Sequence, residues 1–336
     1  MLLPEFKHLK PKTIQDAVSM LSTYQGEVGV MAGGSDLVIK LKQRLVNLRY
    51  LVDLKGISGM NGIISRPGEI EIGALTKLST IESSSEILRE VPLLAKAASL
   101  VAGPQHRRMG TLGGNICLDN RCYYFNQSAR WRQSRPLCYK TGGDRCYVAV
   151  KSLVCHAVYS GDTAPALIAL DARIKVAGPY GIREQSLESL YSGDGKDPIK
   201  LEENSIITSV IIPQSSPCTG FGYEKYRLRE AVDFPVVGVA VSISLNKPGG
   251  ECIRARIVLN AVGTAPFRVV EGEKVLVGGK VEEVLDEAAE LAYKAARPIH
   301  SMGGSPYHKK KLVKVLTRRA LVDAISMANE NKKGGS

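Results

Sequence analysis

The residues best suited to chemistry are four cysteines in the middle of the chain, Cys122, Cys138, Cys146 and Cys155. Successive pairs are separated by 15, 7 and 8 residues, so they lack the C-x2-C pairs typical of zinc fingers, zinc ribbons and bacterial ferredoxins. Four thiolates can nevertheless hold Zn²⁺ or a [4Fe–4S] cluster. A third interpretation is four unrelated thiols in an irregular loop.

The neighbours of these cysteines favour an iron–sulfur cluster. Residues 121–155 carry seven basic side chains and one acidic side chain, and a cubane ligated by four thiolates is an anion that such charge would stabilise. Aromatic side chains that could shield the cluster are Tyr123, Tyr124, Phe125, Trp131, Tyr139 and Tyr147. Cys117 could replace one ligand, whereas we expect Cys218 and Cys252 to be buried apolar residues. An odd number of cysteines, seven in all, argues against a disulfide framework.

Two glycine-rich segments could bind a diphosphate. Gly33-Gly34-Ser35-Asp36 and Thr111-Leu-Gly-Gly-Asn115 both combine paired glycines with hydroxyl or polar side chains. Glycine lets the backbone approach a ligand closely, and the amides at a helix start bind phosphate oxygens. Neither segment matches the Rossmann fingerprint or the P-loop. The alternative for each is an ordinary tight turn.

The net charge of +12 over 336 residues comes from two short blocks. One block is 121–155 and the other is 305–336, which carries eight basic and two acidic side chains, while the rest of the chain is formally neutral. Neither block accompanies a recognisable DNA- or RNA-binding module, so nucleic-acid binding is not favoured. The five histidines show no nucleophile or carboxylate at a diagnostic spacing, and we assign no catalytic acid or base.

The elements that must position these residues are of mixed type. The pattern predicts a helix that starts at Thr13, a strand over 28–32 leading into Gly33, a helix over 37–45 and another over 87–101. After a boundary near 213–219, β-rich runs at 221–228, 236–245 and 252–262 precede helices at 281–296 and 307–328. Strands followed by helices indicate an α+β domain with a three-stranded antiparallel sheet. A surface that is solvated or faces another subunit is expected for Lys310, Lys314 and Arg318.

Nothing in the sequence indicates a membrane or an exported protein. The longest nearly apolar run, 236–245, is too short to cross a bilayer, and the first residues lack the pattern of a signal peptide. We therefore expect a cytoplasmic location.

The motifs together resemble the FAD-binding medium subunits of the molybdenum hydroxylases, the xanthine dehydrogenase and carbon monoxide dehydrogenase family. The resemblance rests on segments 30–37, 72–77, 110–116, 160–172 and 221–240. It implies an α+β fold: an FAD-binding domain of the PCMH (vanillyl-alcohol-oxidase-like) type over 1–216, with subdomains of about 1–56 and 57–216, and a C-terminal domain over 217–330. The residues that it implies for FAD are Val30, Met31, Ala32, Gly33, Gly34, Ser35, Asp36, Leu37, Val101, Thr111, Gly113, Gly114, Asn115, Asp162 and Lys225. Arg227 could also lie near the flavin, although a solvated strand face is the simpler interpretation for Lys225 and Arg227.

Residues 121–155 depart from the ordinary family pattern, which reaches the Asp162 segment by a short loop. This insertion is similar to one in the β subunit of 4-hydroxybenzoyl-CoA reductases, which holds an extra [4Fe–4S] cluster. The resemblance implies that Cys122, Cys138, Cys146 and Cys155 ligate such a cluster in this chain. The resemblance implies an electron-transfer subunit with FAD and a [4Fe–4S] cluster, fed by ferredoxin. Its partners would be a [2Fe–2S] small subunit and a molybdopterin large subunit, in a dimer of heterotrimers that reductively dehydroxylates its substrate to benzoyl-CoA.

Two alternatives remain open at this point. The same cofactors could serve an aldehyde or N-heterocycle oxidoreductase, because the substrate is chosen on another chain. A zinc-stabilised nucleic-acid-binding protein is the alternative from a different class.

Overall fold

The amino-terminal part of the fold is a small parallel sheet with the strand order β1-β3-β2. The computed structural model describes residues 2–330. The first elements are β1 (Lys7–Leu9), α1 (Ile14–Thr23), β2 (Val28–Met31), α2 (Leu37–Lys42), β3 (Tyr50–Asp53) and a 3-10 turn at Leu54–Gly56. The predicted helix start is confirmed: Thr13 Oγ1 accepts a hydrogen bond from the amide of Asp16, and the Asp16 carboxylate accepts one from the amide of Thr13.

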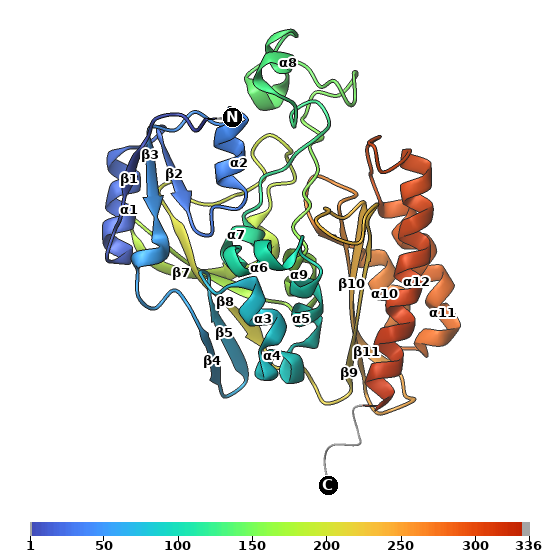
Figure 1. Ribbon diagram of the computed structural model, residues 1–336. Helices are drawn as coiled ribbons and strands as arrows, with labels where there is room; N and C mark the ends of the chain where they lie inside the picture. Colours follow the sequence, from blue (N-terminus) through green and yellow to red (C-terminus); the bar gives the residue numbers. More distant parts are fainter. Residues whose placement is uncertain (1, 331–336) are drawn as a thin grey trace.

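A second sheet of five strands, in the order β4-β5-β8-β6-β7, lies beside the first (Figure 1). Its strands are β4 (Ile63–Arg66), β5 (Glu69–Gly73), β6 (Arg173–Gly178), β7 (Gly181–Ser186) and β8 (Ile206–Pro213), with a 3-10 turn at Glu188–Leu190. The helices next to it are α3 (Leu78–Ser83), α4 (Ser85–Glu90), α5 (Pro92–Ser99), α6 (Pro104–Met109), α7 (Leu112–Ile116) and α9 (Thr163–Ala169). The single helix predicted over 87–101 is therefore wrong. Pro92 lacks an amide donor and begins a new helix instead of continuing α4.

The carboxy-terminal part is an antiparallel sheet of four strands, in the order β12-β11-β10-β9, instead of the three predicted. The elements are β9 (Thr219–Tyr226), β10 (Val237–Leu245), β11 (Cys252–Asn260), β12 (Phe267–Arg268), α10 (Val270–Leu276), α11 (Val281–Ala295) and α12 (Pro306–Glu330). The added strand β12 has only two residues, paired with Val258 and Leu259, and so carries no alternating pattern. The domain boundary expected near 216 falls in the connection between β8 and β9.

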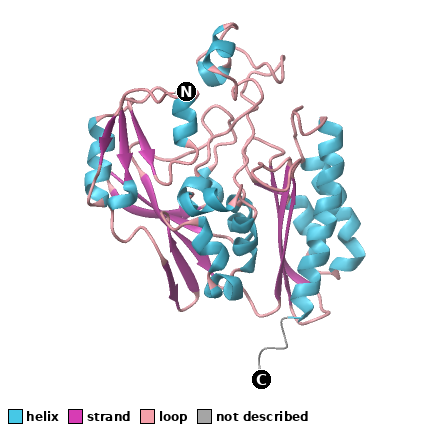
Figure 2. Ribbon diagram, in the orientation of Figure 1, coloured by secondary structure: helices cyan, strands magenta, loops and turns pink. Residues whose placement is uncertain are grey.

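The four-stranded sheet is covered on both faces, as the ribbon coloured by secondary structure makes clear (Figure 2). Helices α5 and α9 pack on the face toward the five-stranded sheet, and α12 packs on the opposite face. All nine residues of β10 are consequently buried. This double burial explains why the run 236–245 is almost continuously apolar.

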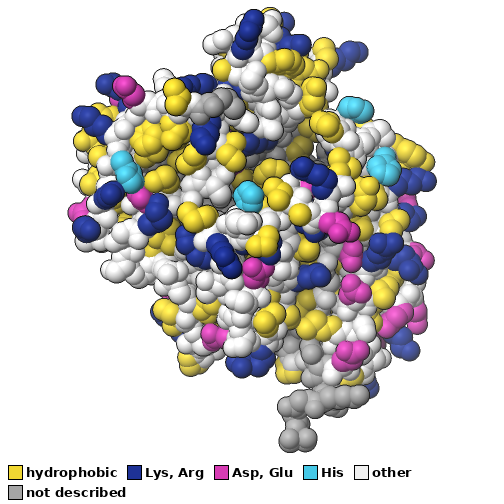
Figure 3. All heavy atoms as spheres, in the orientation of Figure 1, with side chains coloured by type: hydrophobic (Ala, Val, Ile, Leu, Met, Phe, Trp, Pro, Cys, Tyr) yellow, Lys and Arg dark blue, Asp and Glu magenta, His cyan; other side chains and the backbone are white. Residues whose placement is uncertain are grey.

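Residues 121–155 form a lobe with little regular structure, seen at the top of Figure 1. It contains α8 (Ala129–Gln133) and a 3-10 turn at Tyr139–Thr141. Lys and Arg side chains are prominent on its surface in Figure 3. None of the helices within residues 2–330 combines the length and the apolar character needed to span a bilayer.

On the basic face of α12, Lys314 and Arg318 are exposed, in line with the expected solvated surface, and both also form ion pairs. Lys314 pairs with Glu290 and Arg318 with Asp286, both on α11, and the Lys310 ammonium lies over the ring of Tyr293. Much of this charge is thus balanced within the chain. Two further lysines of this block, Lys332 and Lys333, lie outside the described residues.

Candidate functional site

A cavity of about 500 Å³ opens where the two amino-terminal sheets, the central helices and the start of the carboxy-terminal domain meet. All of the predicted cofactor-binding residues except Met31 and Lys225 line it. They are Val30, Ala32, Gly33, Gly34, Ser35, Asp36, Leu37, Val101, Thr111, Gly113, Gly114, Asn115 and Asp162. Residues from four distant parts of the sequence therefore share one cavity.

The two glycine-rich segments are packed against neighbouring backbone. A Cβ atom added at Gly33 would lie 2.0 Å from the carbonyl oxygen of Met109, just before the second segment. Gly34 has a φ of +74°, a conformation that glycine adopts without strain. A Cβ at Gly113 would lie 2.9 Å from the Cβ of Ala74. Glycine is thus required for the close approach of these loops.

The polar groups of these loops fit a diphosphate. Within residues 2–330, the backbone amides of Gly33, Gly34 and Ser35 donate to no protein group, so they present donors of the kind that bind phosphate oxygens. In the second segment, Thr111 Oγ1 accepts a hydrogen bond from the amide of Gly114 at 3.2 Å.

Asn115, at the end of the second segment, is oriented by a neighbouring helix. Its Oδ1 accepts bonds from the amide and hydroxyl of Thr163, at 3.0 and 2.7 Å. Because the oxygen is occupied, the side-chain NH₂ group is the donor that Asn115 can offer to a ligand.

A buried ion pair joins this cavity to the carboxy-terminal domain. Asp162, at the start of α9, accepts a hydrogen bond from Lys225 Nζ on β9 at 2.8 Å, and the two side chains are only 4% and 1% exposed. Burial raises the pKa of Asp162 to about 6, although the Lys225 ammonium opposes the shift. Lys225 also donates to the carbonyl of Leu100. The solvated strand face expected for Lys225 is therefore wrong, and Lys225 supports the cavity from behind Asp162.

The sequence alone did not single out several residues of this cavity. His106 of α6, Val232 and Phe234 of the loop after β9, and Ser205 and Ile207 near β8 all line it. Although Val232 and Phe234 belong to segment 221–240, no sequence pattern places any of these five residues at the cavity, and only the tertiary structure brings them together. His106 is one of the five histidines to which the sequence assigned no role.

A second, smaller cavity lies within the lobe 121–155, and all four of the predicted ligands line it: Cys122, Cys138, Cys146 and Cys155. Tyr124, Tyr139 and Tyr147 line it too, whereas the other expected shielding residues, Tyr123, Phe125 and Trp131, do not. Lys140 and Arg145 contribute the basic groups. Four thiols, three aromatic rings and two cations thus line one small cavity.

Three of the four sulfur atoms accept hydrogen bonds. The amide of Phe125 donates to Cys122 Sγ at 3.4 Å, the amide of Ala157 donates to Cys155 Sγ at 3.5 Å, and the hydroxyl of Thr141 donates to Cys138 Sγ at 3.5 Å. Hydrogen bonds to sulfur stabilise the thiolate form and are one of the ways in which proteins tune iron–sulfur clusters. Burial nevertheless raises the pKa of the Cys155 thiol to about 11, and it raises that of Cys122 as well.

The thiols are not gathered around a single ion. Across residues 2–330, no three Cys, His, Asp or Glu side chains are close enough together to coordinate one metal ion. Cys117 lines the large cavity and not the small one, and it is exposed. Cys252 is buried and Cys218 is half-buried, both in the carboxy-terminal core.

Known proteins share this architecture over the whole chain. Residues 4–215 match the family described as the FAD binding domain in molybdopterin dehydrogenase, and residues 222–324 match the CO dehydrogenase flavoprotein C-terminal domain. The chain is 29% identical to the carbon monoxide dehydrogenase medium chain of Afipia carboxidovorans, over 98% of this chain and 99% of that one. It is 24% identical to the nicotinate dehydrogenase FAD-subunit of Eubacterium barkeri, over 96% and 97%. Among solved structures, a chain of the carbon monoxide dehydrogenase from Hydrogenophaga pseudoflava superimposes with a TM-score of 0.82 at 26% identity, covering 97% of this chain and 99% of that one.

The chain therefore belongs to the family of FAD-binding subunits of molybdenum hydroxylases. Its α+β fold, with a PCMH-type FAD-binding domain and a flavoprotein C-terminal domain, is confirmed. The large cavity fits the FAD that this family binds, and the chain is an oxidoreductase subunit. Family membership leaves the hypothesis of a zinc-stabilised nucleic-acid-binding protein without support.

Proposed function

We propose that this member of the family is an electron-transfer subunit that holds a [4Fe–4S] cluster in addition to FAD. Gly33, Gly34 and Ser35 would bind the FAD diphosphate with their backbone amides, and Asn115 would add its side-chain NH₂ group. Asp162, held by Lys225, would contact the cofactor beside Asn115, which is hydrogen-bonded to the adjacent Thr163. The other predicted lining residues would complete the contact surface.

The observation that carries the cluster proposal is the convergence of Cys122, Cys138, Cys146 and Cys155 on one small cavity. A cubane binds each cysteine through a different iron atom, so its four ligands surround a volume instead of meeting at one point. The hydrogen bonds to three sulfurs and the two cations in the wall suit an anionic cluster.

Together the two cofactors would supply a conversion between two-electron and one-electron transfer. Such a subunit relays electrons and leaves bond-making to other chains. We infer a molybdopterin-binding large subunit and a [2Fe–2S] small subunit as partners, arranged as a dimer of heterotrimers in the cytoplasm. The exposed basic groups of the lobe suit an acidic donor such as ferredoxin, because complementary charge speeds encounter.

The complex that we favour is 4-hydroxybenzoyl-CoA reductase, which forms benzoyl-CoA, because of the cysteine-bearing insertion. A second candidate is an N-heterocycle or aldehyde oxidoreductase, favoured by the similarity to the nicotinate dehydrogenase FAD-subunit. The substrate assay of the purified complex separates the two: reduction of 4-hydroxybenzoyl-CoA supports the first, and oxidation of aldehydes or N-heterocycles supports the second.

Cysteine substitution tests the proposed ligands. Cys138→Ser should lower the iron content and remove or alter the electron paramagnetic resonance signal of the reduced cluster, with FAD retained. Cys218→Ser is the matched control because Cys218 lies in the carboxy-terminal core, and it should keep both. Full iron content and an unchanged signal in Cys138→Ser would show that the ligand assignment is wrong.

A further inference from the structure

Helix α2 is the element through which the two cavities are connected. It follows the Gly33–Asp36 loop directly, and Asp36, Leu37, Ile39 and Lys40 line the FAD cavity. With only six residues, Leu37–Lys42, it is too short to be stable by itself. Its position must therefore come from its tertiary contacts.

Three polar contacts from the 119–155 region reach α2 along its whole length. At its start, Arg121 Nη2 lies 2.6 Å from Asp36 Oδ1. In the middle, Lys40 Nζ lies 2.8 Å from Asp119 Oδ2. At its end, Arg132 Nη2 donates to the carbonyl oxygens of Gln43 and Arg44, at 3.0 and 2.8 Å, where a cation also complements the helix dipole.

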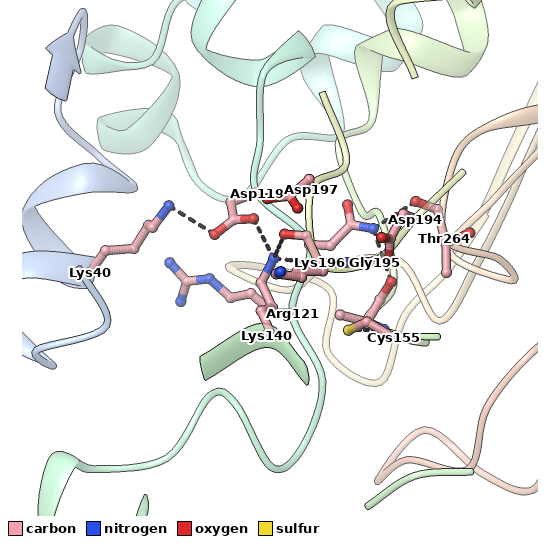
Figure 4. Close-up of polar contacts among 12 residues, drawn as sticks. Lys40, Asp119, Arg121, Lys140, Cys155, Asp194, Gly195, Lys196, Asp197 and Thr264 are labelled. Atoms are coloured by element: carbon pink, nitrogen blue, oxygen red, sulfur yellow. Dashed lines mark hydrogen bonds and ion pairs between the residues drawn. The ribbon is translucent and has the colours of Figure 1, made fainter. Parts of the chain in front are cut away.

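The same contacts lead directly to the cysteines. Arg121 is adjacent to Cys122 in the chain, and Arg132 and Cys138 line the same pocket of the lobe. Asp119 Oδ1 accepts a second bond, at 2.8 Å, from Lys140, which lines the cysteine cavity (Figure 4).

The Lys40–Asp119–Lys140 bridge links α2 at the FAD cavity to the cysteine cavity, so a shift of one can displace the other. Its side chains are 13%, 21% and 5% exposed, so solvent screens them little. Burial alone would raise the pKa of Asp119. The two lysines outweigh this effect and hold that pKa below its ordinary value. Lys140 also donates to the carbonyls of Gly195 and Lys196, and the amide of Gly195 donates to the carbonyl of Cys155.

From this arrangement we infer that Arg121, Asp119 and Arg132 are positioning residues of the FAD site, which clamp α2 to the cysteine-bearing lobe. The FAD affinity then depends on the lobe. Where the lobe holds its cluster, as proposed above, FAD and cluster binding strengthen each other by the same factor.

The first experiment tests the clamp without reference to the cluster. Deflavinated full-length protein is titrated with FAD by flavin fluorescence, for wild type, Arg121→Gln and Asp119→Asn. We expect both variants to bind FAD roughly tenfold more weakly, with unchanged circular dichroism and iron content, and Arg121→Lys to recover part of the affinity. Arg130→Gln is the matched control, because Arg130 is an exposed lobe residue without an ion pair or side-chain hydrogen bond among residues 2–330, and it should bind FAD as wild type does.

Equal FAD affinity in wild type, Arg121→Gln and Asp119→Asn would overturn the clamp. If a variant also loses iron, the comparison is made with Cys138→Ser, which keeps all three contacts. If the clamp variant binds FAD more weakly than Cys138→Ser does, the clamp is supported. If the two variants bind FAD equally well, the clamp is refuted.

The second experiment tests the coupling to the cluster. Iron removal from wild type by chelation should weaken FAD binding severalfold, and in Asp119→Asn it should have a smaller effect. The same loss of affinity in both proteins would refute the coupling. A preparation that never contains iron would refute the cluster of the proposed function, while the first experiment would still decide the clamp.

Discussion

Gly33 has no room for a side chain at the edge of the FAD cavity. Its missing side chain allows the first loop to touch the backbone at Met109, which is fixed by α6 and cannot rotate away as a side chain could. The Gly33–Asp36 loop and the second glycine segment are therefore held at one separation by contact between their backbones.

Gly33→Ala should force the two loops apart. We expect a loss of about 1–3 kcal/mol in the free energy of unfolding, as for overpacking elsewhere, and FAD affinity at least roughly tenfold weaker because the amide donors move. Gly279→Ala is the control, since a Cβ there meets nothing within 4 Å. Flavin titration and thermal unfolding measure both effects, and an unchanged FAD affinity in Gly33→Ala would contradict this account of the loop.

Lys309 of α12 makes stability depend on pH. It is 4% exposed and donates to the carbonyl of Ile299 and the hydroxyl of Ser301, and burial lowers its pKa from 10.5 to about 8. Between these two values the unfolded chain binds the proton more tightly, so the folded state gains stability as the pH rises.

The comparison with Lys309→Met isolates this contribution. From pH 7.5 to pH 10, the free energy of unfolding of wild type should rise relative to that of the variant, by at most about 3 kcal/mol. Denaturant unfolding at both pH values measures the difference. A difference that is independent of pH would show that Lys309 ionises normally in the folded protein.

At the scale of elements, strand β9 and helix α9 are joined by the Asp162–Lys225 pair, the most deeply buried ion pair among the described residues. Removing one partner leaves the other charge buried without compensation, which is far more costly than losing a surface pair. The connection between the carboxy-terminal domain and the FAD cavity therefore rests strongly on these two side chains.

Lys225→Met should lower the free energy of unfolding by roughly 3–5 kcal/mol, and Lys225→Met/Asp162→Asn should recover part of that loss. Lys314→Met, which breaks an exposed pair with Glu290, should cost less than about 1 kcal/mol. Chemical denaturation of the three variants provides the test. Equal losses for Lys225→Met and Lys314→Met would show that burial of the Asp162 pair has no special weight.

Most of these elements could be predicted from sequence because their signals are local. The Thr13 cap, the strand that precedes Gly33 and the apolar run of β10 each follow from residues that are close together in the sequence. The break at Pro92 was also visible in principle, but helical periodicity on both sides concealed it. Strand β12 could not be predicted from the sequence, because its two residues form a strand only by pairing with the edge of β11.

The site was predictable to a lesser degree, because only some of its residues belong to local sequence patterns. The glycine and cysteine residues could be identified as candidates from their type and spacing, and the four thiols do line one cavity. His106, Val232 and Phe234 reach the large cavity only through tertiary packing. The burial of Lys225 depends on the docking of two domains, which no pattern along β9 reveals.

At the scale of the whole molecule, the chain is a family framework for FAD with a cysteine-bearing lobe added beside it. The lobe interrupts the sequence between the second glycine segment and Asp162, and Leu118 before it and Ser160 after it line the FAD cavity. The basic charge concentrated in the lobe accounts for half of the chain's net charge.

The most direct test of this account is the iron, acid-labile sulfide and flavin content of the anaerobically purified protein, measured with its visible and electron paramagnetic resonance spectra. A [4Fe–4S] centre predicts about four iron and four sulfide ions per FAD, and a reduced-state signal that Cys138→Ser abolishes or alters. A flavoprotein without iron, or one with a single zinc ion and no sulfide, would contradict the central claim.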